Sequence, residues 1–194
     1  FETTPHASSY VDLGAGRSAT ALAAGRHHTC ALLDDASIKC WGKNEHGQLG
    51  IPLTTSASRG LVASGMGSGL PAVPLGTGKT TVAVYAGGDV TCAILNDFLT
   101  VSAAATGDVF THASHGLTAN VQVTLAGNLP GGFAAATTYY VVGSSLTANT
   151  FQLSATSGGA VKAVTSNSAG TVLTAVTRTV KCWGSNEDGA LGQG

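Results

Sequence analysis

The four cysteines carry the most definite chemistry in this sequence. Cys30 and Cys40 flank a stretch that reads as a hairpin, with its turn at residues 34–36. If the turn is centred on Asp35, the two cysteines lie directly opposite each other, and opposed residues of an antiparallel pair have Cα atoms about 4.5–5.5 Å apart. That separation suits a disulfide. Zinc is the competing interpretation, but neither cysteine belongs to a C-x-x-C knuckle. The spacing favours a disulfide and, with it, an oxidising location outside the cytoplasm.

Histidines occur in two places where a metal ion could bind. His112 and His115 form an H-x-x-H pattern, and His27 and His28 are adjacent. A metal site needs two or more further ligands, and only Asp108 lies near the first pair in the sequence. On a strand end, His112 and His115 also do not share the helical face on which H-E-x-x-H works. We interpret the histidines as polar loop residues and predict no metal site.

Two further patterns resemble parts of active sites. Asp34 and Asp35 are neighbours, but at a hairpin turn we expect them to accept hydrogen bonds from backbone N–H groups. Residues 75–80 read LGTGKT, yet a phosphate loop needs a glycine at position 73, which is Val73. The sequence also offers no G-x-S-x-G elbow, nucleophile–base pair or cofactor fingerprint. We therefore expect a protein that is not an enzyme and takes no cofactor.

The composition limits the class of protein. Only 10% of the 194 residues are charged, the formal net charge is −1, and hydrophobic residues make up 43%. Nucleic-acid binding needs a clustered basic surface and disorder goes with low hydrophobicity, so neither is expected. No run of about eighteen apolar residues predicts a membrane span. The 27 glycines, with abundant Val and Thr and no Gly-X-Y period, indicate a turn-rich all-β protein. Because the chain starts at Phe1 without a signal-peptide pattern, we expect a processed chain or a fragment.

The elements that position the cysteines occur twice. One set recurs at an offset of 62: Leu13, Gly14, Gly16, Gly25 and Cys30 match Leu75, Gly76, Gly78, Gly87 and Cys92. A second set recurs at an offset of 142: Cys40, Trp41, Gly42, Asn44, Gly47, Leu49 and Gly50 match Cys182, Trp183, Gly184, Asn186, Gly189, Leu191 and Gly192. The offsets differ by 80, the length of an insertion at residues 98–177. Since hairpin tips tolerate insertions whose ends lie close together, we expect Cys92 to pair with Cys182.

The string HTCALLDD-x-S-I-K-CWG-x-N-x-x-G-Q-L-G resembles the regulator-of-chromosome-condensation repeat, in the cysteine-bearing form common in secreted proteins. The resemblance covers residues 11–97 and 178–194, which we take as one repeat domain with a discontinuous second copy. It implies that each copy forms a four-stranded propeller blade, although the family usually closes seven blades into a ring. The blade core that we expect consists of Trp41, Trp183, Leu32, Leu33, Ile94 and Leu95.

The insertion has a different character, because its only formal charges are Asp108 and Lys162. Its β-rich stretches alternate with Gly-rich turns and predict a small β-sandwich or barrel of about five to seven strands. The pattern resembles a small β-module of phage tail and capsid-decoration proteins, which implies a structural role. Aromatic side chains that could stack on sugars are interpreted as β-core residues. They are Phe110, Phe133, Tyr139 and Tyr140.

Two blades by themselves leave faces and strand edges unpaired, because a stable repeat array needs about three or more units. We therefore predict head-to-tail self-assembly into an extracellular filament, with residues 1–10 as a linking strand. The alternative is an adhesin, or a carbohydrate- or protein-binding module, from a longer propeller-repeat surface protein. The nucleotide-exchange role that the resemblance would imply is disfavoured by the disulfides. Expected partners are further copies of the chain, and O-linked glycans on the Thr-rich insertion are an open alternative.

Overall fold

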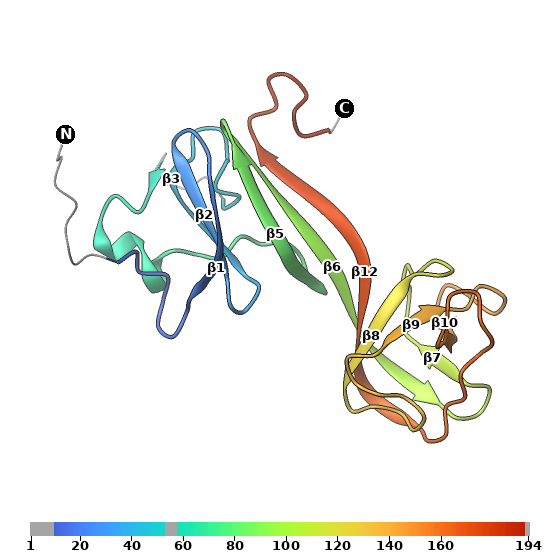
Figure 1. Ribbon diagram of the computed structural model, residues 1–194. Coiled ribbons are helices and arrows are strands. Elements are labelled where there is room, and N and C mark those ends of the chain that lie inside the picture. The colour runs from blue at the N-terminus through green and yellow to red at the C-terminus, as the bar shows by residue number, and fades with distance from the viewer. Residues whose placement is uncertain (1–9, 53–57, 193–194) are drawn as a thin grey trace. The chain divides into compact units, whose positions relative to one another are not determined.

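The computed structural model describes residues 10–52 and 58–192 (Figure 1). These residues form β-strands and two single-turn 3-10 helices, η1 (Ala63–Gly65) and η2 (Gly67–Gly69), which confirms the all-β prediction. No helix in this part of the chain has the length and apolar character needed to cross a bilayer. The predicted linking strand, apart from Tyr10, lies outside the described residues.

The chain divides into two compact units. The first unit consists of Phe1–Leu75, Thr81–Ile94 and Val180–Gly194, and the second of Gly76–Thr80 and Leu95–Thr179. The predicted insertion at residues 98–177 falls within the second unit, which also takes in short flanking stretches of the repeats. Each unit has its own strands and core and is described separately below.

The first repeat forms an antiparallel meander, which we call blade 1. Its strands are β1 (Ala19–Ala24), β2 (His28–Leu33), β3 (Ile38–Lys43) and β4 (Ser58–Arg59), in that spatial order. The ladder between β2 and β3 places Cys30 directly opposite Cys40. Their Sγ atoms lie 2.10 Å apart, at disulfide distance. The hairpin geometry read from the sequence thus agrees with the structure.

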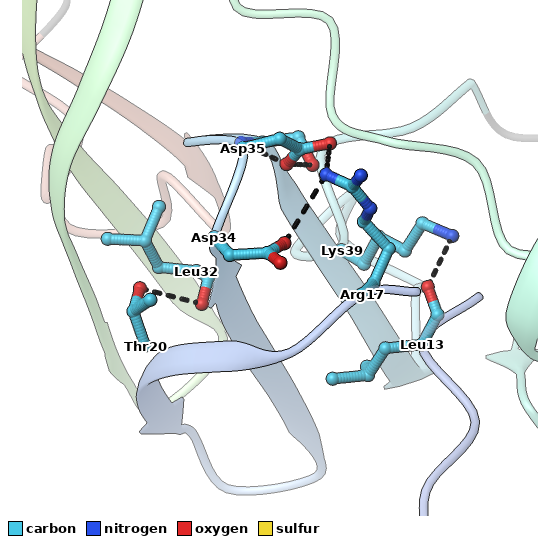
Figure 2. Close-up of polar contacts among 8 residues, drawn as sticks. Leu13, Arg17, Thr20, Leu32, Asp34, Asp35 and Lys39 are labelled. Carbon is cyan, nitrogen blue, oxygen red and sulfur yellow. Dashed lines mark hydrogen bonds and ion pairs between the residues drawn. The ribbon is translucent and has the colours of Figure 1, made fainter. Parts of the chain in front are cut away.

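The turn between β2 and β3 is held by both aspartates. Asp35 accepts hydrogen bonds from the backbone N–H and the hydroxyl of Ser37, at 3.0 and 2.6 Å, as the predicted Asx turn requires. These bonds lower the pKa of the Asp35 carboxyl. The guanidinium of Arg17 pairs with Asp34 at 3.3 Å and with Asp35 at 2.8 Å (Figure 2). Both carboxylates are therefore engaged in fixing the hairpin.

The second repeat forms blade 2, in which β6 lies between β5 and β12. The strands are β5 (Lys79–Gly87), β6 (Val90–Ala104) and β12 (Ser168–Gly184). Cys92 and Cys182 have Sγ atoms 2.12 Å apart although 90 positions separate them. The pairing expected across the insertion is therefore present in the structure.

Contacts in blade 1 recur in blade 2 at the predicted offsets. The Lys39 ammonium donates to the carbonyl of Leu13 at 2.8 Å, and the Lys181 ammonium donates to the carbonyl of Leu75 at 2.9 Å. These two bonds join equivalent positions of the two copies, since 39 and 181 differ by 142 and 13 and 75 by 62. The two repeats share their three-dimensional contacts as well as their sequence pattern.

The second unit is a nearly closed barrel. Its sheet follows the order β10-β7-β6-β12-β8-β9-β11. The strands not yet introduced are β7 (Val109–Thr111), β8 (Gln122–Gly127), β9 (Thr138–Val141), β10 (Thr150–Phe151) and β11 (Leu153–Ser154). The two ends of this order, β10 and β11, are separated in the chain only by Gln152, whose carbonyl accepts the N–H of Val142 at 2.9 Å. The β-rich stretches predicted for the insertion thus form a barrel-like sheet.

The barrel core accounts for most of the aromatic side chains of the insertion. Phe110 and Tyr139 are buried, as the β-core interpretation expects, and Phe133 packs against both. Lys162 lies 5.6 Å from the centroid of the Phe133 ring. The other buried members of the core are Val101, Ala103, Leu117, Val123, Leu125, Val141, Phe151, Leu153, Val164, Leu173 and Ala175.

The residues predicted to form the blade core differ in their burial. Leu32 and Leu33 are buried in blade 1, whereas Ile94 is half-buried. Leu95 is buried but belongs to the second unit, because β6 continues from one unit into the other. Both tryptophans, Trp41 and Trp183, are only half-buried. The position of Trp183 is explained by the contact between the two blades.

Candidate functional site

The histidines do not converge on a metal site. His115 accepts the N–H of Leu117 on its Nδ1 atom at 3.0 Å, and its ring packs edge-on against Phe151 with centroids 5.0 Å apart. The carboxylate of Asp108 accepts a backbone N–H. Residues 10–52 and 58–192 contain no group of three or more His, Cys, Asp or Glu placed to hold a metal ion. The polar-loop interpretation is wrong for His115 and His28, which are 7% and 3% exposed.

The LGTGKT segment serves the second unit rather than a phosphate. It leads directly into strand β5, whereas a phosphate loop opens a helix whose N-terminal N–H groups receive the anion. The ammonium of Lys79 forms an ion pair with Asp97 within the same unit. This lysine has a local structural partner.

The first unit contains a polar contact that joins blade 1 to blade 2. It begins at residues 44–50, which we call the blade 1 loop. The side chain of Asn44 holds the loop by accepting the N–H of Leu49 at 2.9 Å. Gln48, fully buried, then presents its backbone carbonyl to blade 2, where it accepts hydrogen bonds from Thr91 Oγ1 at 2.8 Å and from Trp183 Nε1 at 3.1 Å.

The side chain of Gln48 adds a third bond to this contact. Its amide donates to the carboxylate of Asp89 at 3.2 Å. Asp89, Thr91 and Trp183 therefore form one receiving surface on blade 2, which we call the blade 2 seat. A tryptophan can pack its apolar ring and donate a hydrogen bond from its indole N–H at the same time. Trp183 therefore lies at the edge of blade 2, where its N–H reaches blade 1, and is not enclosed in the blade core.

His28 completes the contact and has a defined tautomer. Thr91 has one hydroxyl hydrogen, which it donates to the carbonyl of Gln48. The contact of 2.8 Å between His28 Nε2 and Thr91 Oγ1 must therefore be donated by the ring, so that in the neutral imidazole Nε2 carries the hydrogen and Nδ1 does not. Nδ1 is buried without a hydrogen-bond partner among the described residues. Burial lowers the pKa of His28, while the charge of Asp89 acts in the opposite direction.

Two glycines allow this close approach of the blades. A Cβ atom on Gly50 would lie 2.6 Å from Nε1 of Trp183 and 2.9 Å from Cγ1 of Val73. A Cβ atom on Gly25 would lie 2.7 Å from the carbonyl oxygen of Gly88 in blade 2. Larger residues at these positions would separate the blades. The glycine pattern of the repeat is thus a requirement of blade contact.

Comparison with known proteins identifies the unit that carries this contact. Residues 19–48 match the family model described as the regulator of chromosome condensation (RCC1) repeat. Blade 1 is therefore similar to an RCC1 repeat. Protein pim1 of Schizosaccharomyces pombe (strain 972 / ATCC 24843) is 43% identical over 42 residues, which make up 22% of this chain and 8% of that protein. The matched stretch thus spans a small part of the relative, and the likeness concerns the repeat at residues 19–48.

The RCC1-type loop occurs a second time, at residues 186–192, which we call the blade 2 loop. Asn186 accepts the N–H of Leu191 at 3.0 Å, as Asn44 does from Leu49. Two further backbone bonds, from Gly189 to Asn186 and from Gly192 to Gly189, also repeat the first loop. The blade 2 loop is nevertheless largely exposed, whereas Leu49 in the first loop is fully buried. The second copy presents a formed loop with no blade packed on it in the part of the chain that the structure describes.

The receiving surface of the RCC1-type blade is also present twice. The residues of blade 1 equivalent to the blade 2 seat are His27, Thr29 and Trp41, which we call the blade 1 seat. The β2–β3 register places Thr29 opposite Trp41. A groove runs along this tryptophan and is lined by Tyr10, Val11, Asp12, Trp41, Gly60, Ala63 and Met66. The equivalent groove at Trp183 has Gly50 of the neighbouring blade in its wall.

Sequence reasoning missed the polar residues of this contact. Gln48 and Thr91 were not selected, and His28 was considered only as a metal ligand. Gln48 lies within the repeated N-x-x-G-x-L-G loop, and that repetition is the signal that marks the loop as structural. The side chains that donate to the Gln48 carbonyl come from the neighbouring blade, so the loop pattern alone does not identify them. The repeat pattern in the sequence predicted the two blades, whereas the hydrogen bonds that join them are seen only in the structure.

Proposed function

We propose that this chain is an extracellular structural subunit that associates head to tail through its RCC1-type blades and thereby forms a filament. The proposal assigns no catalytic step to the chain. Heterologous contacts, in which two different surfaces of a subunit meet, close into a ring or propagate as a filament, according to the rotation between subunits. The two surfaces required are the blade 2 loop and the blade 1 seat.

One observation carries the proposal. Within the first unit, an RCC1-type loop packs on the next blade through Gln48, Thr91 and Trp183. The same loop geometry recurs at residues 186–192, where the loop is largely exposed. A surface that is already folded loses little conformational entropy when it binds, which favours association.

The two disulfides support the extracellular part of the proposal. Cys30–Cys40 and Cys92–Cys182 leave no free cysteine. Structural disulfides persist in oxidising compartments and are rare in the cytosol. Intact-mass measurement with and without reduction tests this, because each bridge adds about two mass units on reduction; four free thiols in the native protein would contradict the assignment. The same spectrum reports any attached O-linked sugar.

The assembly itself is tested on the purified chain. Light scattering over a concentration series is expected to show growth beyond the monomer mass, and electron micrographs to show filaments. Closed rings of fixed size would retain head-to-tail contact and exclude the filament. A chain that stays monomeric at all concentrations would overturn the proposal and favour a binding module that needs further blades of a longer protein.

A further inference from the structure

We infer that the blade 1 seat binds the blade 2 loop of a second copy of this chain, in the register of the internal blade contact. This inference rests on the proposed head-to-tail association and adds which residues meet. In the internal contact, Gln48 faces Asp89, Thr91 and Trp183. The repeat offsets translate this set into Ala190 facing His27, Thr29 and Trp41.

The backbone part of the contact is retained. Gln48 uses its carbonyl oxygen to accept from Thr91 and Trp183, and any residue at that position provides a carbonyl. Thr29 and Trp41 carry the same hydroxyl and indole donors as their counterparts in blade 2. The replacement of Gln48 by Ala190 therefore leaves both backbone hydrogen bonds available to the second copy.

The side-chain part of the contact changes on both sides together. Gln48 donates its amide to the carboxylate of Asp89. Ala190 has no amide, and the residue that would face it is His27 instead of an aspartate. The blade 2 loop on an Asp89-type seat would leave a carboxylate without its donor, which is costly when the group is desolvated. Because Ala190 replaces Gln48 on the loop and His27 replaces Asp89 on the seat, the blade 2 loop fits the blade 1 seat better than an Asp89-type seat.

Charge follows the same division. The seat of blade 1 begins with Arg26 and His27 where blade 2 has Gly88 and Asp89. The blade 2 loop carries Glu187 and Asp188 where the blade 1 loop has Glu45 and His46. Arg26 and His27 are exposed, as are Glu187 and Asp188. A more acidic loop thus corresponds to a more basic seat, and complementary charges favour the correct partner and accelerate association.

The second copy is the occupant that these observations select. A partner of different sequence would have to supply the loop, the carbonyl and the acidic residues independently. This chain supplies all of them in a segment whose backbone already has the bound geometry seen at residues 44–50. The pairing also extends the existing blade contact by one further repeat in each subunit.

Cross-linking between two variants tests the register. Ala190→Cys and His27→Cys are made in separate chains, because both positions are exposed and each variant is expected to fold. The two proteins are mixed and treated with a short bismaleimide, which reacts with thiols and leaves the native disulfides intact. Covalent dimers are expected in the mixture and absent from either variant alone.

Two controls frame this result. The double variant Arg26→Cys with Gly88→Cys places thiols at two exposed positions whose backbones are joined across the blade boundary by a hydrogen bond of 2.8 Å, so it must give an intramolecular cross-link. Ala190→Cys mixed with Thr118→Cys, an exposed position of the second unit, is expected to give none. Raising salt to about 1 M, where the Debye length is about 3 Å, is expected to weaken association of the unmodified chain.

The possible outcomes distinguish the inferred register of the contact from the proposed head-to-tail association on which it rests. Multimers by light scattering without the 190–27 cross-link, while the 26–88 control reacts, would overturn this register and leave self-association standing. Equal cross-linking of positions 27 and 118 to position 190 would also overturn it. A chain that is monomeric under all conditions would overturn both the register and the proposed function.

Discussion

Nε2 of His28 donates a hydrogen bond to Oγ1 of Thr91 over 2.8 Å, across the boundary between two blades and 63 positions of sequence. The Thr91 hydroxyl in turn donates a hydrogen bond to the carbonyl of Gln48. Three polar residues from two blades are thus linked in one buried line. These bonds require a hydrogen on Nε2, since Thr91 has no second hydrogen to donate, so the neutral form of the ring is the Nε2–H tautomer.

The first prediction concerns the pH dependence of this contact. Burial lowers the pKa of His28 from its ordinary value of 6.5. In the interval between the lowered value and 6.5, the unfolded chain therefore binds more protons than the folded chain. The contribution of His28 to the free energy of unfolding is therefore fully present above pH 6.5, and it is lost as the pH falls from 6.5 through the folded-state pKa. Urea unfolding between pH 8 and pH 5, followed by tryptophan fluorescence, measures this, because both tryptophans lie in the first unit.

Matched histidine variants assign the effect. His28→Asn retains a side-chain donor but removes the titrating group, so most of the loss of stability between pH 6.5 and pH 5 should disappear. His27→Asn makes the same substitution at the exposed neighbour and is the matched variant with which the His28→Asn profile is compared. An unaltered profile in His28→Asn would show that another group is responsible.

The second prediction distinguishes the two tryptophans. Trp183→Phe removes the donor to the carbonyl of Gln48 and should lower the free energy of unfolding by about 1 kcal/mol, the usual net value of one hydrogen bond. Trp41→Phe removes the equivalent donor from the blade 1 seat. It should leave the stability of the monomer nearly unchanged and weaken self-association instead. Thermal unfolding and sedimentation velocity on both variants measure the two effects, and the reverse assignment would contradict the repeat equivalence.

Whether a contact could be predicted from the sequence depends on how far apart its residues lie in the chain. The opposition of Cys30 and Cys40 could be read from a hairpin of eleven positions, because a short antiparallel pair has a register set by its turn. Cys92 and Cys182 were predictable because the repeat supplied the missing hairpin. The half-burial of Trp183 and the burial of His28 were not predictable, since each depends on the blade that faces it. Leu95 was misplaced for a related reason: strand β6 continues past the blade into the barrel.

The third prediction uses two equivalent glycines. Gly50 has φ +66°, and a Cβ atom there would lie 2.6 Å from Trp183. Gly192 has φ +65°, and a Cβ atom there would meet nothing within 4 Å. Alanine at either position bears the cost of a left-handed backbone, but only Gly50→Ala adds the clash, which should cost about 1–3 kcal/mol more. Parallel urea titrations give the difference, and equal losses would show that the blades part without cost.

The last prediction compares the two disulfides. The bridge between Cys92 and Cys182 closes a loop of 90 positions and the bridge between Cys30 and Cys40 a loop of 10. In the chain-entropy description, the cross-link stabilises by restricting the unfolded chain, and the longer loop should contribute about 2 kcal/mol more. Serine pairs at each bridge, Cys92→Ser with Cys182→Ser and Cys30→Ser with Cys40→Ser, keep the comparison matched in chemistry. The free energy of unfolding, measured by tryptophan fluorescence, should therefore fall further when Cys92 and Cys182 are replaced. The same bridge joins β6 and β12, the two strands that continue from blade 2 into the barrel. Its loss should therefore also accelerate proteolysis near residues 95 and 179. Equal destabilisation by both pairs, with an unchanged cleavage pattern, would mean that β6 and β12 hold together without their bridge.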